Sequence, residues 1–409
     1  MSGGVDADDA LVDYIWCETT SGERHLFEIL TFTGGVSTCT AVTTTESVGA
    51  TFSGADWHIN GTRKSFDVDS SNSDENDWNV GWQIELASGV YTHSTHFTPG
   101  QNTVFSSLSP GIEVYAAAGS STRPQIQVDG NIKHFEGRQF CLVKFTFIEF
   151  NRPSSSNGGS NNYFDTSQGC NANLMDCVID NSMGSATQPS QLISVQYGRR
   201  VLTAVNCYFR GGADRICRIN QCEAVKFYSC HFDGDDGTYG SVAAVGATNG
   251  TNDNVEIVNC LIEAPGGAGF FTPTDNDDAS VTIMNNTFVD CGGNAVEFED
   301  SAGSSDNSPT RSVVILNNLV AYSGGYAFVT PTTATGRLRM EGGSIFAGNA
   351  TYSNTSGAYT GQITSGTSDV ALTADPFVDR PGRDYSLNTT SGGGADCTDA
   401  AYPSTLPTP

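Results

Sequence analysis

The feature that most restricts the fold of this chain is an eight-residue pattern that recurs seven times. The copies are ANLMDCVI from Ala172, LTAVNCYF from Leu202, VKFYSCHF from Val225, VEIVNCLI from Val255, VTIMNNTF from Val281, VVILNNLV from Val313 and LRMEGGSI from Leu338. A looser copy, FCLVKFTF, begins at Phe140. The sixth residue of each copy is taken as its anchor, which gives Phe145, Cys177, Cys207, Cys230, Cys260, Asn286, Asn318 and Gly343, spaced by 23 to 32 residues. A unit of this length predicts a repeat architecture in which each unit stacks on the next.

The residue pattern inside each copy predicts strands. The first and third positions are apolar while the second varies, which is the alternation of a strand with one buried face. A second short apolar stretch follows the anchor, and four copies then reach a Gly-Gly pair, at Gly211, Gly266, Gly292 and Gly324. Glycine permits the positive φ that a sharp corner requires. A third apolar stretch comes after the corner, so each repeat contains three short strands.

Three strands per repeat describe one coil of a right-handed parallel β-helix. Leucine-rich repeats, propeller blades and helical repeats each need a motif or period that this chain lacks. We therefore expect an all-β chain with a solenoid over residues 56–370. About ten coils spaced by about 4.8 Å would make a shaft roughly 45 to 50 Å long. Residues 1–55 form a small β-rich cap or docking module in this interpretation, and residues 371–409 form an irregular C-terminal cap.

Stacked coils turn one repeat position into a ladder along the solenoid. We expect a structural ladder made of Cys177, Cys207, Cys230, Cys260, Asn286 and Asn318. Interior asparagines can pass amide hydrogen bonds from coil to coil, and thiols can fill the same corner as small apolar groups. Disulfides are the alternative, but in-register side chains keep their Cβ atoms about 4.8 Å apart, which is wider than a disulfide prefers. A metal site in CRINQC, from Cys217 to Cys222, is a further alternative with only half of the usual ligand set.

Composition argues against several classes of partner. The 409 residues include 19 basic and 45 acidic side chains, for a net charge of −26, so we expect no nucleic-acid partner. The chain has no run of about 18 apolar residues, so we expect no membrane span. The first residues, MSGGVDADDALVDYIW, lack the pattern of a signal peptide, which predicts synthesis in a cytoplasm without a classical export signal.

The candidate catalytic residues are acidic. Asp235 and Asp236 follow Asp214 by 21 and 22 residues, about one coil, so these carboxylates could meet as an acid and a base. The arrangement resembles the aspartate trio of polygalacturonase-type hydrolases, although the Gly-His-Gly and Arg-Ile-Lys motifs of that family are absent. Surface-turn chemistry in GDDG is the alternative interpretation, and a calcium loop made of Asp233, Asp235 and Asp236 is another. No other cofactor is expected.

Two further segments carry a family resemblance. WQIELASGVYTHSTHF from Trp82 resembles the first coil of single-stranded, pectate-lyase-like parallel β-helix proteins, and LTADPFVDRPGRDYSLNTTSGGGADC from Leu372 resembles their closing segment. Such proteins occur among bacterial surface proteins and phage virion proteins. The resemblance implies a structural or adhesive virion protein, such as a tailspike, fibre or capsid-decorating subunit, that engages a host surface or glycan without catalysis. A polysaccharide lyase or glycoside hydrolase on the same scaffold is the alternative.

The same resemblance implies partners and a location. Other virion proteins would dock on residues 1–55, and cell-surface polysaccharide is the expected ligand. A homo-oligomer, by analogy a trimer, is expected because closed symmetry is usual in homo-oligomers. The virion is the expected location, and the extracellular space is the alternative.

Overall fold

A computed structural model describes most of the repeat region and parts of both ends. The described residues are 14–18, 24–35, 38–44, 56–60, 83–93, 112–128, 135–138, 142–151, 164–168, 171–180, 191–196, 201–220, 222–234, 242–247, 254–264, 266–273, 280–299, 310–311, 313–330, 339–340, 345–361, 365–366 and 368–397.

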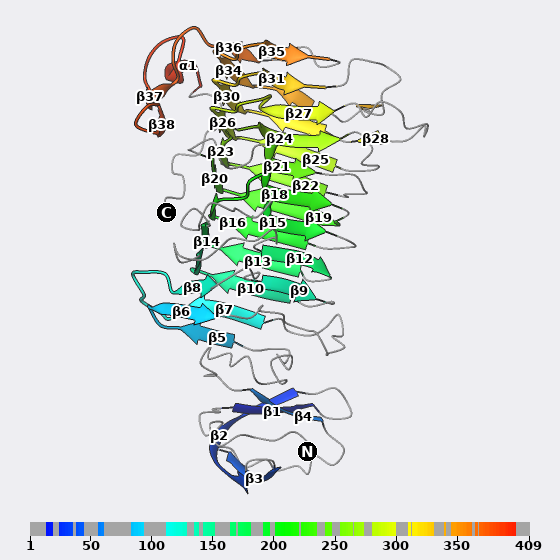
Figure 1. Cartoon of the computed structure of the whole chain (residues 1–409), viewed down its shortest axis with the longest axis vertical. Coiled ribbons are helices and arrows are strands. Elements are labelled where there is room, and N and C mark those ends of the chain that lie inside the picture. The colour runs from blue at the N-terminus through cyan, green and yellow to red at the C-terminus, as the bar shows by residue number, and fades with distance from the viewer. Residues whose placement is uncertain are drawn as a thin grey trace.

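Three parallel sheets form a β-solenoid (Figure 1). The first sheet contains β5 (Gln83–Leu86), β7 (Ile112–Ala116), β10 (Leu142–Thr146), β13 (Asn171–Met175), β16 (Val201–Val205), β19 (Ala224–Tyr228), β22 (Asn254–Val258), β25 (Ser280–Met284), β29 (Val313–Leu316) and β33 (Ile345–Ala347). The second contains β6 (Val90–His93), β8 (Gln125–Val128), β11 (Glu149–Asn151), β14 (Val178–Asp180), β17 (Tyr208–Arg210), β20 (His231–Asp233), β23 (Leu261–Glu263), β26 (Thr287–Val289), β30 (Leu319–Ala321), β34 (Ala350–Tyr352) and β36 (Val370–Ala371). The third contains β9 (Phe135–Arg138), β12 (Phe164–Gln168), β15 (Gln191–Gln196), β18 (Arg215–Asn220), β21 (Ala243–Ala247), β24 (Ala268–Pro273), β27 (Val296–Glu299), β31 (Tyr326–Val329) and β35 (Gly357–Thr360).

The all-β solenoid expected from the repeat is thus confirmed, but the expected count of about ten coils is not. The sheets hold 10, 11 and 9 strands, so nine coils of the described chain carry all three strands. A two-stranded coil made of β5 and β6 precedes them, and β36 follows them as a single strand. The count differs because the sequence pattern does not show which terminal coils lack a strand.

Shorter elements lie outside the three sheets. β1 (Tyr14–Glu18), β2 (Arg24–Gly35), β3 (Thr38–Thr44) and β4 (Asp56–Asn60) form an antiparallel sheet in the order β3-β2-β1-β4. β28 (Thr310–Arg311) pairs with β32 (Arg339–Met340). The C-terminal segment contains the antiparallel hairpin of β37 (Phe377–Asp379) and β38 (Asp384–Leu387), followed by α1 (Gly394–Cys397).

The hydrophobic core runs through the interior of the solenoid. Strands of the first sheet alternate between buried and partly exposed residues, as β16 and β22 show. Aromatic rings fill the interior and meet edge to face; the centroids of Phe227 and Phe232 lie 5.0 Å apart. Because burial of a phenylalanine side chain contributes about 1.5–3 kcal/mol, this column of rings stabilises every coil that it crosses.

A sharp corner follows each strand of the first sheet. The residue just before the ladder position has a positive φ, close to 55°, in Asp176, Asn206, Asn259, Asn285 and Asn317. Short polar side chains tolerate this left-handed backbone better than β-branched or bulky ones. The fifth position of the repeat is therefore Asp, Ser or Asn in the six copies that the ladder joins.

The Gly-Gly pairs were expected to supply positive φ at the corners, but only one of the four pairs does so. Gly211 and Gly212 have positive φ values, whereas Gly324 and Gly325 do not. A Cβ on Gly324 would lie 2.3 Å from the carbonyl oxygen of Gly292, and a Cβ on Gly325 would lie 2.2 Å from Oδ1 of Asn294. Glycine is needed at these two positions because successive coils approach too closely for a side chain.

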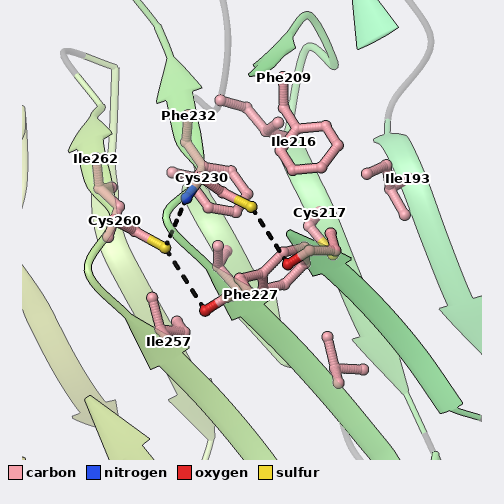
Figure 2. Packing of buried hydrophobic residues seen from close by; sticks show 14 of the residues in the cluster. Ile193, Phe209, Ile216, Cys217, Phe227, Cys230, Phe232, Ile257, Cys260 and Ile262 are labelled. Carbon is pink, nitrogen blue, oxygen red and sulfur yellow. Dashed lines mark hydrogen bonds between the residues drawn. The ribbon is translucent and has the colours of Figure 1, made fainter. Parts of the chain in front are cut away.

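The ladder consists of stacked interior groups (Figure 2). The backbone N–H of Cys230 points at Sγ of Cys260, 3.3 Å away, and the N–H of Cys260 donates to Oδ1 of Asn286 over 2.8 Å. The N–H of Asn286 donates in turn to Oδ1 of Asn318. Thiol and amide oxygen thus accept the same inter-coil hydrogen bond, which explains why the repeat uses both residue types.

The anchors assigned from the sequence at Phe145 and Gly343 are wrong, and the ladder residues Asn349 and Asp369 were missed. Phe145 pairs with Leu174, so Ile148 occupies the coil position equivalent to Cys177. At the other end, Leu316 pairs with Ala347, so Asn349 and not Gly343 continues the ladder. Asp369 closes it by accepting the N–H of Asn349 over 2.8 Å. Apolar alternation alone selected LRMEGGSI, but its residues Arg339 and Met340 belong to β32, outside the first sheet.

The ladder thiols are expected to be unreactive in the folded protein. Cys177, Cys207, Cys230 and Cys260 are free and fully buried, and burial raises the pKa of the first three. Because the thiolate is the reactive form, N-ethylmaleimide should label these four residues only after denaturation. Peptide mass spectrometry of native and denatured samples measures this site by site. Rapid native labelling of any of the four would contradict the buried ladder.

Candidate functional site

The C-terminal segment covers the outer face of the second sheet. Its apolar residues form a second hydrophobic cluster with that face, which contains Leu261, Val289, Leu319, Ala321, Ala350, Leu372, Phe377 and Cys397. Figure 1 shows the hairpin and α1 beside the C-terminal strands of this sheet. Residues on both sides of the second sheet are therefore buried, as in β23, β26 and β30.

Two buried carboxylates lie beneath this segment. Phe232 pairs with Ile262, so Asp233 and Glu263 occupy equivalent places on adjacent coils. They are 2% and 3% exposed. Like charges so close and so well buried require compensation by cations or hydrogen-bond donors.

Arg383 of the hairpin supplies the compensating charge. Its Nη2 lies 2.7 Å from Oδ1 of Asp233 and 2.6 Å from Oε1 of Glu263, and its Nε donates to Oε2 of Glu263 over 3.1 Å. Tyr385 donates to the same Oε2 over 2.8 Å. From the solenoid, Nε2 of His231 lies 2.6 Å from Oε1 of Glu263, and Tyr208 donates to Asp233. We refer to Tyr208, His231, Asp233, Glu263, Arg383 and Tyr385 as the buried ion cluster.

A second ion pair fixes the same hairpin nearby. Arg380 donates to the carboxylate of Asp290, and its guanidinium lies over the ring of Tyr322, 3.8 Å from the centroid. Tyr322 donates to Asp375 over 2.5 Å. The hairpin is thus attached to three successive coils of the second sheet through β20, β23 and Asp290 at the end of β26.

The pKa shifts describe a charged and saturated cluster. Burial raises the pKa of Asp233 and of Glu263, but hydrogen bonds from Tyr208, His231 and Arg383 outweigh burial, so both carboxylate pKa values lie below their usual range. Burial and the neighbouring carboxylates raise the pKa of Tyr208 and of Tyr385. At neutral pH the carboxylates are therefore ionised and the phenols protonated. The oxygens of Asp233 and Glu263 are occupied by donors of this chain, so the arrangement acts as a clamp between hairpin and solenoid.

The structure describes only two of the acidic residues that the sequence singled out as catalytic or calcium-binding candidates, Asp214 and Asp233. Asp214 precedes β18 of the third sheet, and its backbone carbonyl accepts from Val242 over 2.9 Å. Asp233 ends β20 of the second sheet and belongs to the buried ion cluster. Asp235 and Asp236 lie outside the described residues. In the part of the chain that the structure describes, no group of three or more His, Cys, Asp or Glu side chains could hold a metal ion. Cys217 and Cys222 are buried there and are not linked by a disulfide.

Sequence reasoning missed the partners that the hairpin contributes. Arg383 is separated from Asp233 by 150 residues and from Glu263 by 120. The repeat pattern ends before the hairpin, so it carries no information about which coil the hairpin contacts. The available signal was the high density of charged residues in DRPGRDY, from Asp379 to Tyr385.

The clamp makes the free energy of unfolding depend on pH in the acidic range. Since the pKa of Asp233 and of Glu263 is lower in the folded chain, their contribution is present above the unfolded value of about 4 and is lost as pH falls below it. The thermal midpoint should drop between about pH 5 and 3. The Glu263→Gln variant should begin with a lower midpoint and depend less steeply on pH. Scanning calorimetry across this range measures both slopes, and equal slopes would contradict the assignment.

Comparisons with known proteins place this chain in no family. No protein-family model matches it, and no curated protein does. Among solved structures, a mutant of the PL6-family alginate lyase AlyGC is similar with a TM-score of 0.33 and 12% sequence identity. The match covers 82% of this chain and 58% of the lyase chain. A likeness this distant bears on neither the substrate nor the mechanism of this chain.

Within the described residues, no helix is long and apolar enough to cross a membrane.

Proposed function

We propose that the chain is a structural or adhesive β-solenoid that engages a glycan or host surface without cutting it. The observation that carries this proposal is the buried ion cluster. A general acid or base must exchange a proton with a substrate, whereas the oxygens of Asp233 and Glu263 are occupied by donors of the chain itself. These two carboxylates thus stabilise the attachment of the hairpin.

The same proposal includes a place in a virion, as a spike, fibre or capsid-decorating subunit. A stack of coils with a continuous hydrophobic core and a clamped C-terminal segment suits a rigid shaft. The net charge of −26 favours solubility at high local concentration. Residues 1–55 would provide the attachment to other virion proteins, and closed symmetry, by analogy three-fold, would provide the oligomer.

Two measurements test the proposal with the full chain. An antibody against the protein should label particles with heads or tails in negative-stain electron microscopy of the native material. Incubation with acidic and neutral polysaccharides should leave their chain length unchanged by size-exclusion chromatography. Label confined to free protein would overturn the virion assignment. Shortened polysaccharide would overturn the non-catalytic one and favour the lyase or hydrolase alternative.

A further inference from the structure

Strand β18 contains several buried side-chain atoms that could form hydrogen bonds but have no partner. Seven such side-chain atoms occur among the described residues, and three of them are Nε of Arg215, Nε of Arg218 and Oδ1 of Asn220. Asn220 is only 7% exposed. Native proteins contain few buried unsatisfied groups, because each costs about 1–3 kcal/mol, so three on one strand need an explanation.

The three side chains share the outer face of the third sheet. Cys217 and Ile219 point into the core, so Arg218 and Asn220, which alternate with them, point outward. Arg218 pairs with Gly246 on the next coil. A Cβ on Gly246 would lie 2.5 Å from Nε and 2.6 Å from Cδ of Arg215, so the side chain of Arg215 crosses this glycine on the same face. The absence of a side chain at Gly246 creates the space for Arg215.

The charges at this site are unbalanced. The chain has 19 basic residues against 45 acidic ones, yet two guanidinium groups lie together here. Burial, followed by repulsion from Arg218, lowers the pKa of Arg215, and Asp214 opposes this effect. Among the described residues, neither arginine forms an ion pair with a carboxylate. A bound anion would relieve the repulsion between these two guanidinium groups.

We propose that the outer face of β18 binds an acidic saccharide. Arg215 and Arg218 would donate to a carboxylate or sulfate group, since the planar guanidinium matches such oxyanions in two-point hydrogen bonds. Successive outward positions lie about 6.5 Å apart, roughly the distance across one sugar ring. This site rests on the proposed function, because its ligand is the glycan that the solenoid would engage.

Isothermal titration calorimetry of the full chain tests the site. The probes are a hexuronic-acid tetrasaccharide, a sulfated neutral-sugar tetrasaccharide and the unmodified neutral tetrasaccharide. We expect binding of at least one anionic probe and none of the neutral one. Arg218→Ala should weaken that binding about tenfold to hundredfold, since a charge-assisted hydrogen bond contributes about 1.5–3 kcal/mol. The preferred anionic probe distinguishes carboxylate from sulfate recognition.

Three further variants separate recognition from folding and from net charge. Arg218→Lys keeps the charge but loses the two-point geometry, and Gly246→Ala displaces Arg215 without changing any charge, so both should weaken binding. Lys144→Ala removes a charge from the first sheet and should leave binding unchanged. Circular dichroism and thermal midpoints identify any variant that misfolds.

The outcomes also distinguish this site from the proposed function. If no anionic probe binds, or if the Arg218 and Gly246 variants bind as tightly as the original chain, the site is wrong. In the second case an adhesive function at another surface stands. If the chain binds the probe through these residues and also shortens it, the site is right and the non-catalytic function is wrong.

Discussion

Replacing Arg383 with methionine is expected to release the C-terminal hairpin from the solenoid. Asp233 and Glu263 are only 2% and 3% exposed. The substitution leaves these two carboxylates buried next to each other without the cation that they share. Removing one member of a buried ion pair costs about 3–5 kcal/mol, and we expect the lower end because Arg383 itself is partly exposed. In a stacked architecture the loss should stay local to the coils that the hairpin contacts. Hydrogen exchange should therefore speed up in residues 372–397 and in β20 and β23.

The neighbouring residue Asp384 provides the matched control for this prediction. Asp384 lies on the same hairpin but is exposed, and its Oδ1 accepts from the backbone of Ser386. Asp384→Asn should leave exchange in the hairpin unchanged. Adding Asp233→Asn and Glu263→Gln to Arg383→Met should recover part of the loss, because no uncompensated carboxylate remains. If Arg383→Met alone leaves exchange and thermal midpoint unchanged, the clamp does not hold the hairpin.

The Asn318→Ala substitution is expected to weaken the C-terminal part of the solenoid. Nδ2 of Asn318 donates to the carbonyl of Ile283 over 2.9 Å and to Oδ1 of Asn349 over 3.0 Å, and its own Oδ1 accepts from Asn286. Alanine would remove these partners from the buried N–H of Asn286 and carbonyl of Ile283, at about 1–3 kcal/mol for each, and would add a cavity, while Oδ1 of Asn349 keeps the backbone N–H of residue 318. We expect a total loss of about 4 kcal/mol in the free energy of unfolding. Denaturant unfolding followed by tyrosine and tryptophan fluorescence measures it.

Two other substitutions bracket this effect. Asn173→Ala changes an asparagine on the outward side of β13 and should alter stability only slightly. Cys260→Asn should be tolerated, because the new amide could accept the N–H of Cys230 and donate toward the carbonyl of Phe227, where Sγ now lies 3.6 Å away. An Asn318→Ala variant as stable as Asn173→Ala would show that the amide ladder contributes little.

Much of the solenoid could be predicted from local pattern. The alternation of apolar residues gave the strands of the first sheet, and the polar fifth position marks the left-handed corner that ends each of them. The ladder residues from Cys177 to Asn318 followed from the spacing of the repeats. Where the pattern weakened, at Phe145 and Gly343, the register was wrong by several residues, since apolar alternation does not distinguish a strand of the first sheet from a neighbouring strand.

The functional residues were harder to predict because they act across long separations. Asp233 was considered as a calcium ligand, but it meets Arg383, which comes from a hairpin 150 residues further along the chain. Arg215, Arg218 and Asn220 lie within CRINQC or just before it. The sequence interpretation of this segment concerned only its two cysteines, as possible metal ligands. The proposed site depends on the position of Gly246, which lies on the next coil, and on side-chain atoms that lack a hydrogen-bond partner. Neither feature is visible in a linear sequence.

The sequence by itself determined the repeating coil, the small or amide-bearing ladder residues and the acidic surface, because these depend on contacts within one repeat or between equivalent positions of neighbours. Only the tertiary structure decided where the C-terminal hairpin lies, which carboxylates it neutralises and which polar atoms stay unpaired on β18. These features depend on contacts between non-equivalent residues. Their energies come from burial and charge compensation, which exist only once the coils and the hairpin are packed together.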